Sequence, residues 1–189
     1  GYSRASREDA REGHQKEVEG EHRIMETMCY QISPELLLEP IDAESAAEAS
    51  RSGDTKIWLD LQTTDAGELE MWLDRLGVAG LPRRLCLEAR DRAAFYPLKD
   101  ALLLVIPLTG GMDDSRRSGY LLFFCRDDFL LTVHDGRIFS EAQLDELRSD
   151  DSWLPERSIA GLVSAILISL SLASLKYAAK MRDMVFSLV

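Results

Sequence analysis

Residues able to do acid–base or nucleophilic chemistry are few and scattered in this chain. Of its three histidines, His14 and His22 lie in a polar N-terminal stretch, and only His134 lies in an apolar region. A thiol nucleophile would need His134 beside Cys125 or Cys86 and a third group that orients the imidazole, and nothing in the sequence supports that geometry. A lone histidine at the end of an apolar run is typical of a hydrogen-bonded structural residue. The motifs GxGxxG, GxxxxGKS/T, HExxH and GxSxG are absent. The sequence therefore indicates no enzyme, no catalytic residue and no cofactor-binding residue.

Two pairs of adjacent aspartates are the remaining candidates for binding, and the ligand that suits them is a hard cation. Asp113-Asp114 lies in the polar stretch GGMDDSRRSG (110–119), and Asp127-Asp128 separates two apolar runs. Either pair could bind Mg²⁺ or Ca²⁺ through carboxylates and water. A solvated loop for the first pair and turn chemistry for the second are the simpler interpretations. No metal ligand is assigned from the sequence.

Composition and charge indicate a soluble globular chain. Its 189 residues, 46% of them hydrophobic, can bury one sizeable core. The formal net charge of −11 argues against nucleic-acid binding, which needs a basic face. An acidic surface would raise the local concentration of cations, although ordinary solubility explains the charge as well. The three cysteines, Cys29, Cys86 and Cys125, form no CxxC pair, which predicts buried free thiols in a reducing compartment.

The elements around these residues are mainly strands in the middle of the chain. The segment YLLFFCRDDFLLTVHDG (120–136) holds two apolar runs, Tyr120–Cys125 and Phe129–His134, which predict two adjacent strands. In KIWLDLQ (56–62), alternation predicts a half-buried strand with Trp58 and Asp60 pointing outward.

A third strong strand pattern is ALLLVIPL (101–108), which is apolar on both faces. Such a run predicts a strand at the centre of the sheet, covered on both sides by helices. The preceding Phe95-Tyr96-Pro97-Leu98 predicts a strand that pairs with it around Lys99-Asp100.

Other segments carry weaker or shorter patterns. Residues 1–23 are polar without a secretory signal and predict a solvated arm, or a helix whose order depends on contacts that it makes elsewhere. The remaining expected elements are strands at Ile24–Ile32 and Leu36–Ile41, a helix at Ala43–Ala49, a helix with an Asp65/Glu68 capping box that ends at Gly77, a helix opened by Pro82 with Leu81, Leu85 and Cys86/Leu87 inside, and a helix with a Ser140/Gln143 capping box.

The C-terminal segment 158–189 begins with 18 residues that carry no charge, Ser158–Leu175. That length raises a transmembrane interpretation. Five of the 18 residues are serines and no second span follows, so a helix buried against the sheet or a partner subunit is favoured. The expected organisation is an arm at 1–23, an α/β domain at 24–157 and a long helix at 158–189 that begins a stalk.

Several of these segments, taken in order, resemble one known family. KIWLDLQTTDAGELEMWLDRLGV resembles the W-[IL]-[DHN]-[LI] strand and the ELxxLxxxLGL helix of the CorA/ZntB family of divalent metal-ion transporters. YLLFFCRDDFLLTVHDG resembles the strand pair of that family, which ends in histidine. The resemblance covers residues 56–158 well and 159–189 loosely.

The resemblance implies a three-layer α/β/α domain with a mixed central sheet. Such a domain is the cytoplasmic regulatory and assembly part of a homopentameric divalent metal cation transporter for magnesium, cobalt or zinc. The family places it at the cytoplasmic face of the inner or plasma membrane and adds transmembrane helices of the same chain, here expected beyond Val189. The chain itself is then expected to be soluble, to lack a pore and to require no cofactor. The alternative is a free-standing soluble α/β ligand-binding protein or enzyme whose site is not recognised.

The sequence departs from the magnesium branch of this family at its acidic positions. Where those members carry a Glu-Asp pair, this chain has Arg84 and Leu85, and the acid-rich helix reads VSAILISLSLASLKY. Arginine keeps its positive charge and repels a cation. The departures resemble the ZntB branch or a divergent member. A regulatory ion would have to use other acids, such as Glu88, Asp91 or Asp183.

Overall fold

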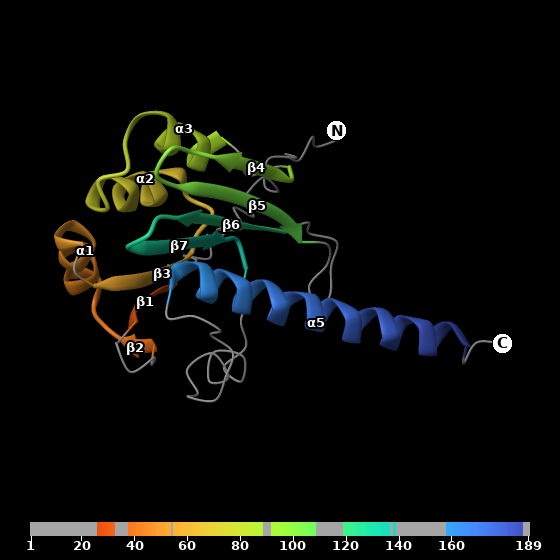
Figure 1. The fold of residues 1–189 in the computed structure, drawn as a ribbon. Helices are drawn as coiled ribbons and strands as arrows, with labels where there is room; N and C mark the ends of the chain where they lie inside the picture. Colours follow the sequence, from red (N-terminus) through yellow and green to blue (C-terminus); the bar gives the residue numbers. More distant parts are fainter. Residues whose placement is uncertain are drawn as a thin grey trace, which may run out of the picture.

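The computed structural model is a three-layer α/β/α domain from which one long helix projects (Figure 1). It describes residues 26–32, 38–53, 55–88, 92–108, 119–136, 138 and 158–186. In chain order the elements are β1 (Glu26–Ile32), β2 (Leu38–Pro40), α1 (Ala43–Ser52), β3 (Lys56–Gln62), α2 (Ala66–Arg75), α3 (Gly80–Glu88), β4 (Ala94–Pro97), β5 (Leu102–Leu108), β6 (Gly119–Cys125), β7 (Phe129–His134) and α5 (Ile159–Phe186). The predicted fold class is confirmed.

The seven strands form one mixed sheet with the order β2-β1-β3-β7-β6-β5-β4. The contact between β3 and β7 is parallel, and the other neighbouring pairs are antiparallel. Both edge strands are short and end in a proline, Pro40 on β2 and Pro97 on β4. Side chains from α1, α2 and α3 pack on one face, and side chains from the first turns of α5 pack on the other.

The predicted strand pair at 120–136 is confirmed as the β6–β7 hairpin. Hydrogen bonds within the turn stabilise it. The Arg126 backbone N–H donates to the Phe129 carbonyl at 2.8 Å, and the Arg126 Nε donates to the Asp128 carboxylate at 2.9 Å. The Arg126 guanidinium also lies 4.4 Å from the centre of the Phe129 ring. The Asp127-Asp128 pair therefore belongs to a turn, and the Asp128 carboxylate forms an ion pair with the Arg126 guanidinium.

The predicted central position of the run at 101–108 is wrong. β5 lies next to the edge strand β4, and the order of strands puts β3 and β7 at the centre. Its Leu103 and Val105 are buried, while Leu102 and Leu104 on the opposite face are only half-buried. Apolar residues on both faces indicated two covering layers, but they carried no information about which strands would pair outside β5.

The predicted outward orientation of Trp58 and Asp60 is also wrong. Both are buried, with exposed fractions of 0% and 1%. Ile57, Leu59 and Leu61 do point to the opposite face, so the alternation itself is right. The reason for the error is that β3 is a central strand whose second face is covered, so that neither side of it meets water.

Helices α1 and α2 follow their sequence signals closely. The Asp42 carboxylate caps α1 by accepting from the Glu44 and Ser45 N–H groups at 3.0 and 2.9 Å. α1 ends at Gly53, whose φ of +72° suits glycine. Asp65 caps α2, but the predicted reciprocal contact with Glu68 is replaced, because the Glu68 carboxylate accepts from the Thr63 hydroxyl instead.

Helix α3 differs from its prediction in one residue. Cys86 is fully buried and Leu85 and Leu87 are half-buried, as expected, but Leu81 is 49% exposed. Cys86 lies five positions after Leu81, and this spacing turns a side chain by about 140° around a helix. The first turn of α3 therefore presents Leu81 to solvent.

Helix α5 is buried against the sheet only at its beginning. Ile159, Leu162, Ala165 and Ile166 are 0–4% exposed, which confirms packing on the sheet for these turns. Farther along, the helix extends past the sheet (Figure 1), so the sheet does not bury the second half of 158–175, and burial of that half against a partner subunit stays a prediction. No helix among the described residues is long and apolar enough to cross a membrane. The expected arm at 1–23, the polar loop at 110–118 and the helix around Ser140 and Gln143 lie outside the described residues.

The burial of α2 makes a direct prediction about stability. Leu73 on α2 is 0% exposed, while Met71 on the same helix is 39% exposed. We expect Leu73→Ala to lower the free energy of unfolding by about 2–5 kcal/mol, since it removes buried methyl groups and leaves a cavity. Met71→Ala is the matched control and should cost less than about 1 kcal/mol. Urea unfolding of both variants measures the difference, and equal losses would contradict the packing of α2 described above.

Candidate functional site

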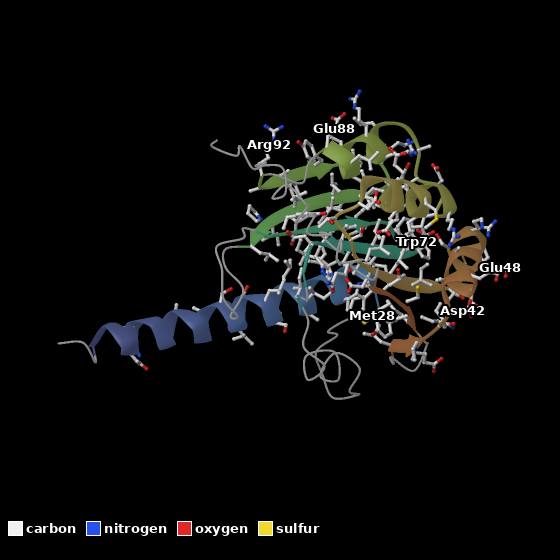
Figure 2. All side chains as sticks on the ribbon, turned by 180° about the vertical axis from the view of Figure 1, so that it is seen from behind. Met28, Asp42, Glu48, Trp72, Glu88 and Arg92 are labelled. Atoms are coloured by element: carbon white, nitrogen blue, oxygen red, sulfur yellow. The ribbon has the colours of Figure 1, made fainter. Side chains whose placement is uncertain are left out.

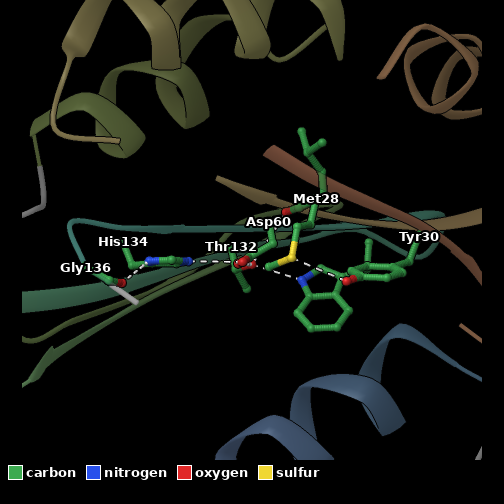
Figure 3. Close-up of polar contacts among 8 residues, drawn as sticks. Met28, Tyr30, Asp60, Thr132, His134 and Gly136 are labelled. Carbon is green, nitrogen blue, oxygen red and sulfur yellow. Dashed lines mark hydrogen bonds and ion pairs between the residues drawn. The ribbon is translucent and has the colours of Figure 1, made fainter. Parts of the chain in front are cut away.

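The chemistry-bearing residues that the structure brings together form a buried network on the two central strands. We call Trp58, Asp60, Thr132 and His134 the β3–β7 network. Parallel pairing sets Asp60 opposite Thr132 and Gln62 opposite His134. Because residues two apart on a strand share a face, the four side chains lie on the same side of the sheet. That side is the one that receives α5, and α2 and α3 lie across the sheet from it (Figure 3).

The hydrogen bonds of the network run in one chain. The Trp58 indole N–H donates to the Thr132 hydroxyl at 2.9 Å, and the Thr132 hydroxyl donates to Oδ1 of Asp60. The second carboxylate oxygen of Asp60 lies 3.0 Å from Nε2 of His134. Nδ1 of His134 faces the carbonyl oxygen of Gly136, just past the end of β7. Every polar atom named here therefore has a partner.

The partners of His134 fix its charge. A carbonyl oxygen can only accept, so Nδ1 must carry a proton, and a carboxylate accepts from a protonated Nε2. Burial on its own lowers the pKa of His134, but the hydrogen bond and the charge of Asp60, the Gly136 carbonyl and the charge of Asp135 outweigh it. The net result is a raised pKa for His134. When both ring nitrogens of His134 carry a proton, the arrangement is a buried imidazolium–carboxylate pair.

This network suits structural stabilisation rather than catalysis. Asp60, Thr132 and His134 are 0–2% exposed, so a substrate cannot reach them. The cysteines are free and buried as predicted. Burial raises the pKa of Cys125 to about 12, and burial followed by the charges of Asp42 and Asp60 raises that of Cys29 to about 11, so both stay thiols. His134 is buried and hydrogen-bonded, as the sequence indicated, and the expectation that it has no catalytic role stays a prediction.

The positions that carry acids in the magnesium branch lie on α3. Arg84 is exposed and its Nε lies 4.0 Å from the Glu88 carboxylate, one helical turn away. Leu85 is half-buried and packs against the core. Glu88 lies on the outer side of α3 (Figure 2). Among the described residues, no three acidic, histidine or cysteine side chains are grouped so that they could hold a metal ion. Asp91 lies outside the described residues.

The outer surface of α5 is the other distinctive feature. Ile168, Leu172 and Leu175 are 42–65% exposed, which is unusual for large apolar side chains. On the same stretch, the hydroxyls of Ser171 and Ser174 donate to backbone carbonyls one turn earlier, at 2.7 and 2.9 Å. These serines therefore offer little free hydrogen-bonding capacity to water. Asp183 is paired with Arg182 at 3.0 Å.

Sequence reasoning found His134 but missed its partners. The signal was present, since W-x-D at 58–60 and T-x-H at 132–134 each place two polar-capable side chains on one face. The two motifs can be connected only if β3 and β7 are known to be parallel neighbours. In the chain, 66 residues lie between the end of β3 and the start of β7. No local pattern carries that information.

The Thr132 hydroxyl offers the most specific test of the network. Thr132→Val keeps the shape of the side chain but leaves the Trp58 N–H and Oδ1 of Asp60 without their partner. We expect the free energy of unfolding to fall by about 1–3 kcal/mol. Thr64→Val, at an exposed position, is the control and should stay within about 0.5 kcal/mol of the parent chain. If both variants unfold at the same denaturant concentration, the network contributes nothing to stability.

Comparisons with solved structures bear on the fold. The chain is similar to the full-length CmaX protein, with a TM-score of 0.66 and 16% identity over 85% of this chain and 49% of that chain. It is similar to the soluble domain of CorA from Methanocaldococcus jannaschii, with a TM-score of 0.62 and 18% identity over 87% of this chain and 63% of that one. It is also similar to the ZntB cytoplasmic domain from Vibrio parahaemolyticus, with a TM-score of 0.52 and 17% identity over 68% of this chain and 52% of that one. The chain spans about half the length of the full-length CmaX protein.

Comparison with protein families is more direct. No curated protein sequence matches the chain. The sequence profile of the family described as CorA-like Mg²⁺ transporter protein matches residues 53–183, which run from the end of α1 to the last turns of α5. Because that match covers well over half of the chain, the protein belongs to the CorA-like Mg²⁺ transporter family.

Proposed function

We propose that this chain is the cytoplasmic regulatory and assembly domain of a CorA/ZntB-like membrane transporter for a divalent metal cation, which is magnesium, cobalt or zinc. The observation that carries the proposal is the continuous family match over residues 53–183. The match includes both the α/β core and the helix that leaves it. In this role the domain has no catalytic chemistry, and the metal ion is the cargo of the complete transporter.

The shape of α5 supports the assembly half of the proposal. Its first turns are anchored in the sheet through Ile159, Leu162 and Ile166, and the remainder projects beyond the domain (Figure 1). A projecting helix that exposes Leu172 and Leu175 favours packing against further helices. In the complete protein, those helices belong to neighbouring subunits of a homopentamer and to the transmembrane region of the same chain beyond Val189.

The same geometry supports a regulatory role that acts through packing. A helix anchored at one end behaves as a lever, so a small rotation of the domain moves the far end by a larger distance. Two domains that shift against each other would therefore alter the direction of their α5 helices. Arg84 and Leu85 favour this mechanical coupling over the direct holding of an ion by the domain.

The coding sequence and an uptake experiment test the proposal. The reading frame after Val189 should encode a helix of several dozen residues followed by two apolar spans. A strain deficient in divalent-cation uptake should accumulate magnesium, cobalt or zinc when it expresses the complete frame, and not when it expresses the frame truncated after Val189. A stop codon directly after Val189 would contradict the proposal and favour a free-standing ligand-binding protein or enzyme.

The response to magnesium is a separate prediction about regulation. A ligand that binds only the folded chain raises its stability by RT ln(1 + [L]/Kd). Mg²⁺ is held through carboxylates, but Glu88 is paired with Arg84, and Asp183 with Arg182. We expect millimolar Mg²⁺ to shift the melting temperature no more than a monovalent salt of equal ionic strength.

The outcome that would contradict this expectation is a saturable rise in melting temperature that is specific to Mg²⁺. If that rise were lost in Glu88→Ala or Asp183→Ala, those carboxylates would be the ligands. Such a result would show that the domain senses magnesium with residues other than those of the magnesium branch.

A further inference from the structure

We propose that the Asp60–His134 pair is a pH-dependent contact that joins the C-terminal halves of β3 and β7 beneath the anchored end of α5. We call this pair the clamp. With His134 protonated, the clamp is closed. When the imidazole loses a proton, the clamp opens and the packing of the first turns of α5 loosens. This inference concerns the response of the domain to pH, and it holds whatever the domain is attached to.

The hydrogen bonds of Thr132 and His134 determine where the protons of the network lie. The Thr132 hydroxyl accepts from Trp58, so its own proton is available to Oδ1 of Asp60. The other oxygen, Oδ2, lies 3.0 Å from Nε2 of His134, and the Gly136 carbonyl occupies Nδ1. Loss of either ring proton is costly here. Without the Nε2 proton a ring lone pair would face the Asp60 carboxylate, and without the Nδ1 proton a ring lone pair would face the Gly136 carbonyl, in both cases in a site that excludes water. An unsatisfied buried acceptor pair of this kind is costly.

The described neighbours of the pair are acidic or apolar. Asp60 on β3 and Asp135 just after β7 both act on His134 through their negative charge. On the neighbouring strands, β6 sets Leu121 opposite His134, and β1 sets Met28 opposite Asp60. The thiol of Cys29 on β1 stays neutral because burial, then Asp42 and Asp60, raises its pKa.

Among the described residues, the side chains of α5 that are buried against the sheet are apolar, namely Ile159, Leu162, Ala165 and Ile166. Two titratable side chains belong to the same apolar layer. They are Tyr30 on β1, whose ring stacks on Trp58 at 5.2 Å, and Cys125 on β6, whose thiol stays neutral because burial raises its pKa to about 12. Loss of the His134 proton would therefore leave Asp60 as a buried negative charge beside apolar side chains.

Trp58 connects the clamp to α5. Its indole N–H is bonded to Thr132, and its ring belongs to the same apolar cluster as Ile159, Leu162 and Ile166. The chain of contacts thus runs from His134 through Asp60 and Thr132 to Trp58, and from there to the anchored turns of α5. A change at His134 reaches α5 through this short series.

The direction of the pH effect follows from the raised pKa of His134. A histidine in the unfolded chain has a pKa of about 6.5. The clamp therefore contributes its full stability below that pH, and the contribution is lost as the pH rises through the higher folded-state pKa. The domain is expected to loosen as the pH rises through the folded-state pKa of His134, and to keep this contribution as the pH falls below that pKa.

Imidazole NMR of the 189-residue chain tests the first half of the proposal. His14→Gln and His22→Gln together leave His134 as the single histidine, so ¹⁵N-labelled imidazole reports on it alone. We expect a titration midpoint above about 6.5, with both ring nitrogens protonated below that midpoint. Asp60→Asn should lower that midpoint by about one pH unit or more. A parent midpoint at or below 6.5 would overturn the proposal, and this measurement does not depend on whether Asp60→Asn folds.

Hydrogen exchange tests the connection to α5. After correction for the intrinsic pH dependence of exchange, the protection of amides at 162–166 in α5 should fall several-fold as the pH passes the His134 midpoint. Helix α2 covers the opposite face of the sheet, so its amides at 69–73 are the matched control. We expect their protection to fall by a smaller factor. Equal changes in the two helices would indicate general loosening of the fold, and no change in either would show that His134 titrates without an effect on packing. Either result would overturn the role of the clamp in holding α5.

Discussion

The parallel contact between β3 and β7 is the constraint on which the rest of this domain depends. Two parallel strands cannot be joined by a tight turn, so the chain between them must leave the sheet and return. Here that excursion contains α2, α3 and β4–β6, which complete one side of the sheet and cover one of its faces. The flank formed by β1 and β2 attaches to the other side of β3. The position of each layer thus follows from where these two strands meet.

Local signals in the sequence predicted the elements well and their neighbours poorly. The hairpin at 120–136 and the cap of α2 at Asp65 depend on residues close together in the chain, and both are present in the fold. The central position of β3, by contrast, depends on β7, and so the burial of Trp58 and Asp60 was missed. The run at 101–108, which is apolar on both faces, indicated two covering layers, and the family resemblance implied the same three-layer arrangement. It did not identify the partners of His134, because those contacts join two motifs that are distant in the chain.

A buried charge pair is a costly way to stabilise a strand contact. The loss of hydration of both ions offsets much of their attraction, and apolar side chains of similar volume often perform as well. What the pair adds is a definite register. A shift of β3 by one residue would move Asp60 to the opposite face of the sheet and leave His134 facing an apolar neighbour. On this view the network selects one pairing of two strands that are both rich in leucine and would otherwise fit together in more than one way.

The two prolines at the sheet edges limit how copies of this domain can meet. Proline has no backbone N–H to donate, and the edge strands β2 and β4 have only three and four residues. A neighbouring chain that approached either edge would find too short a row of backbone groups to extend the sheet. Subunits crowded together by an oligomer can therefore touch through their helices without merging their sheets, and such crowding carries little risk of edge-to-edge aggregation.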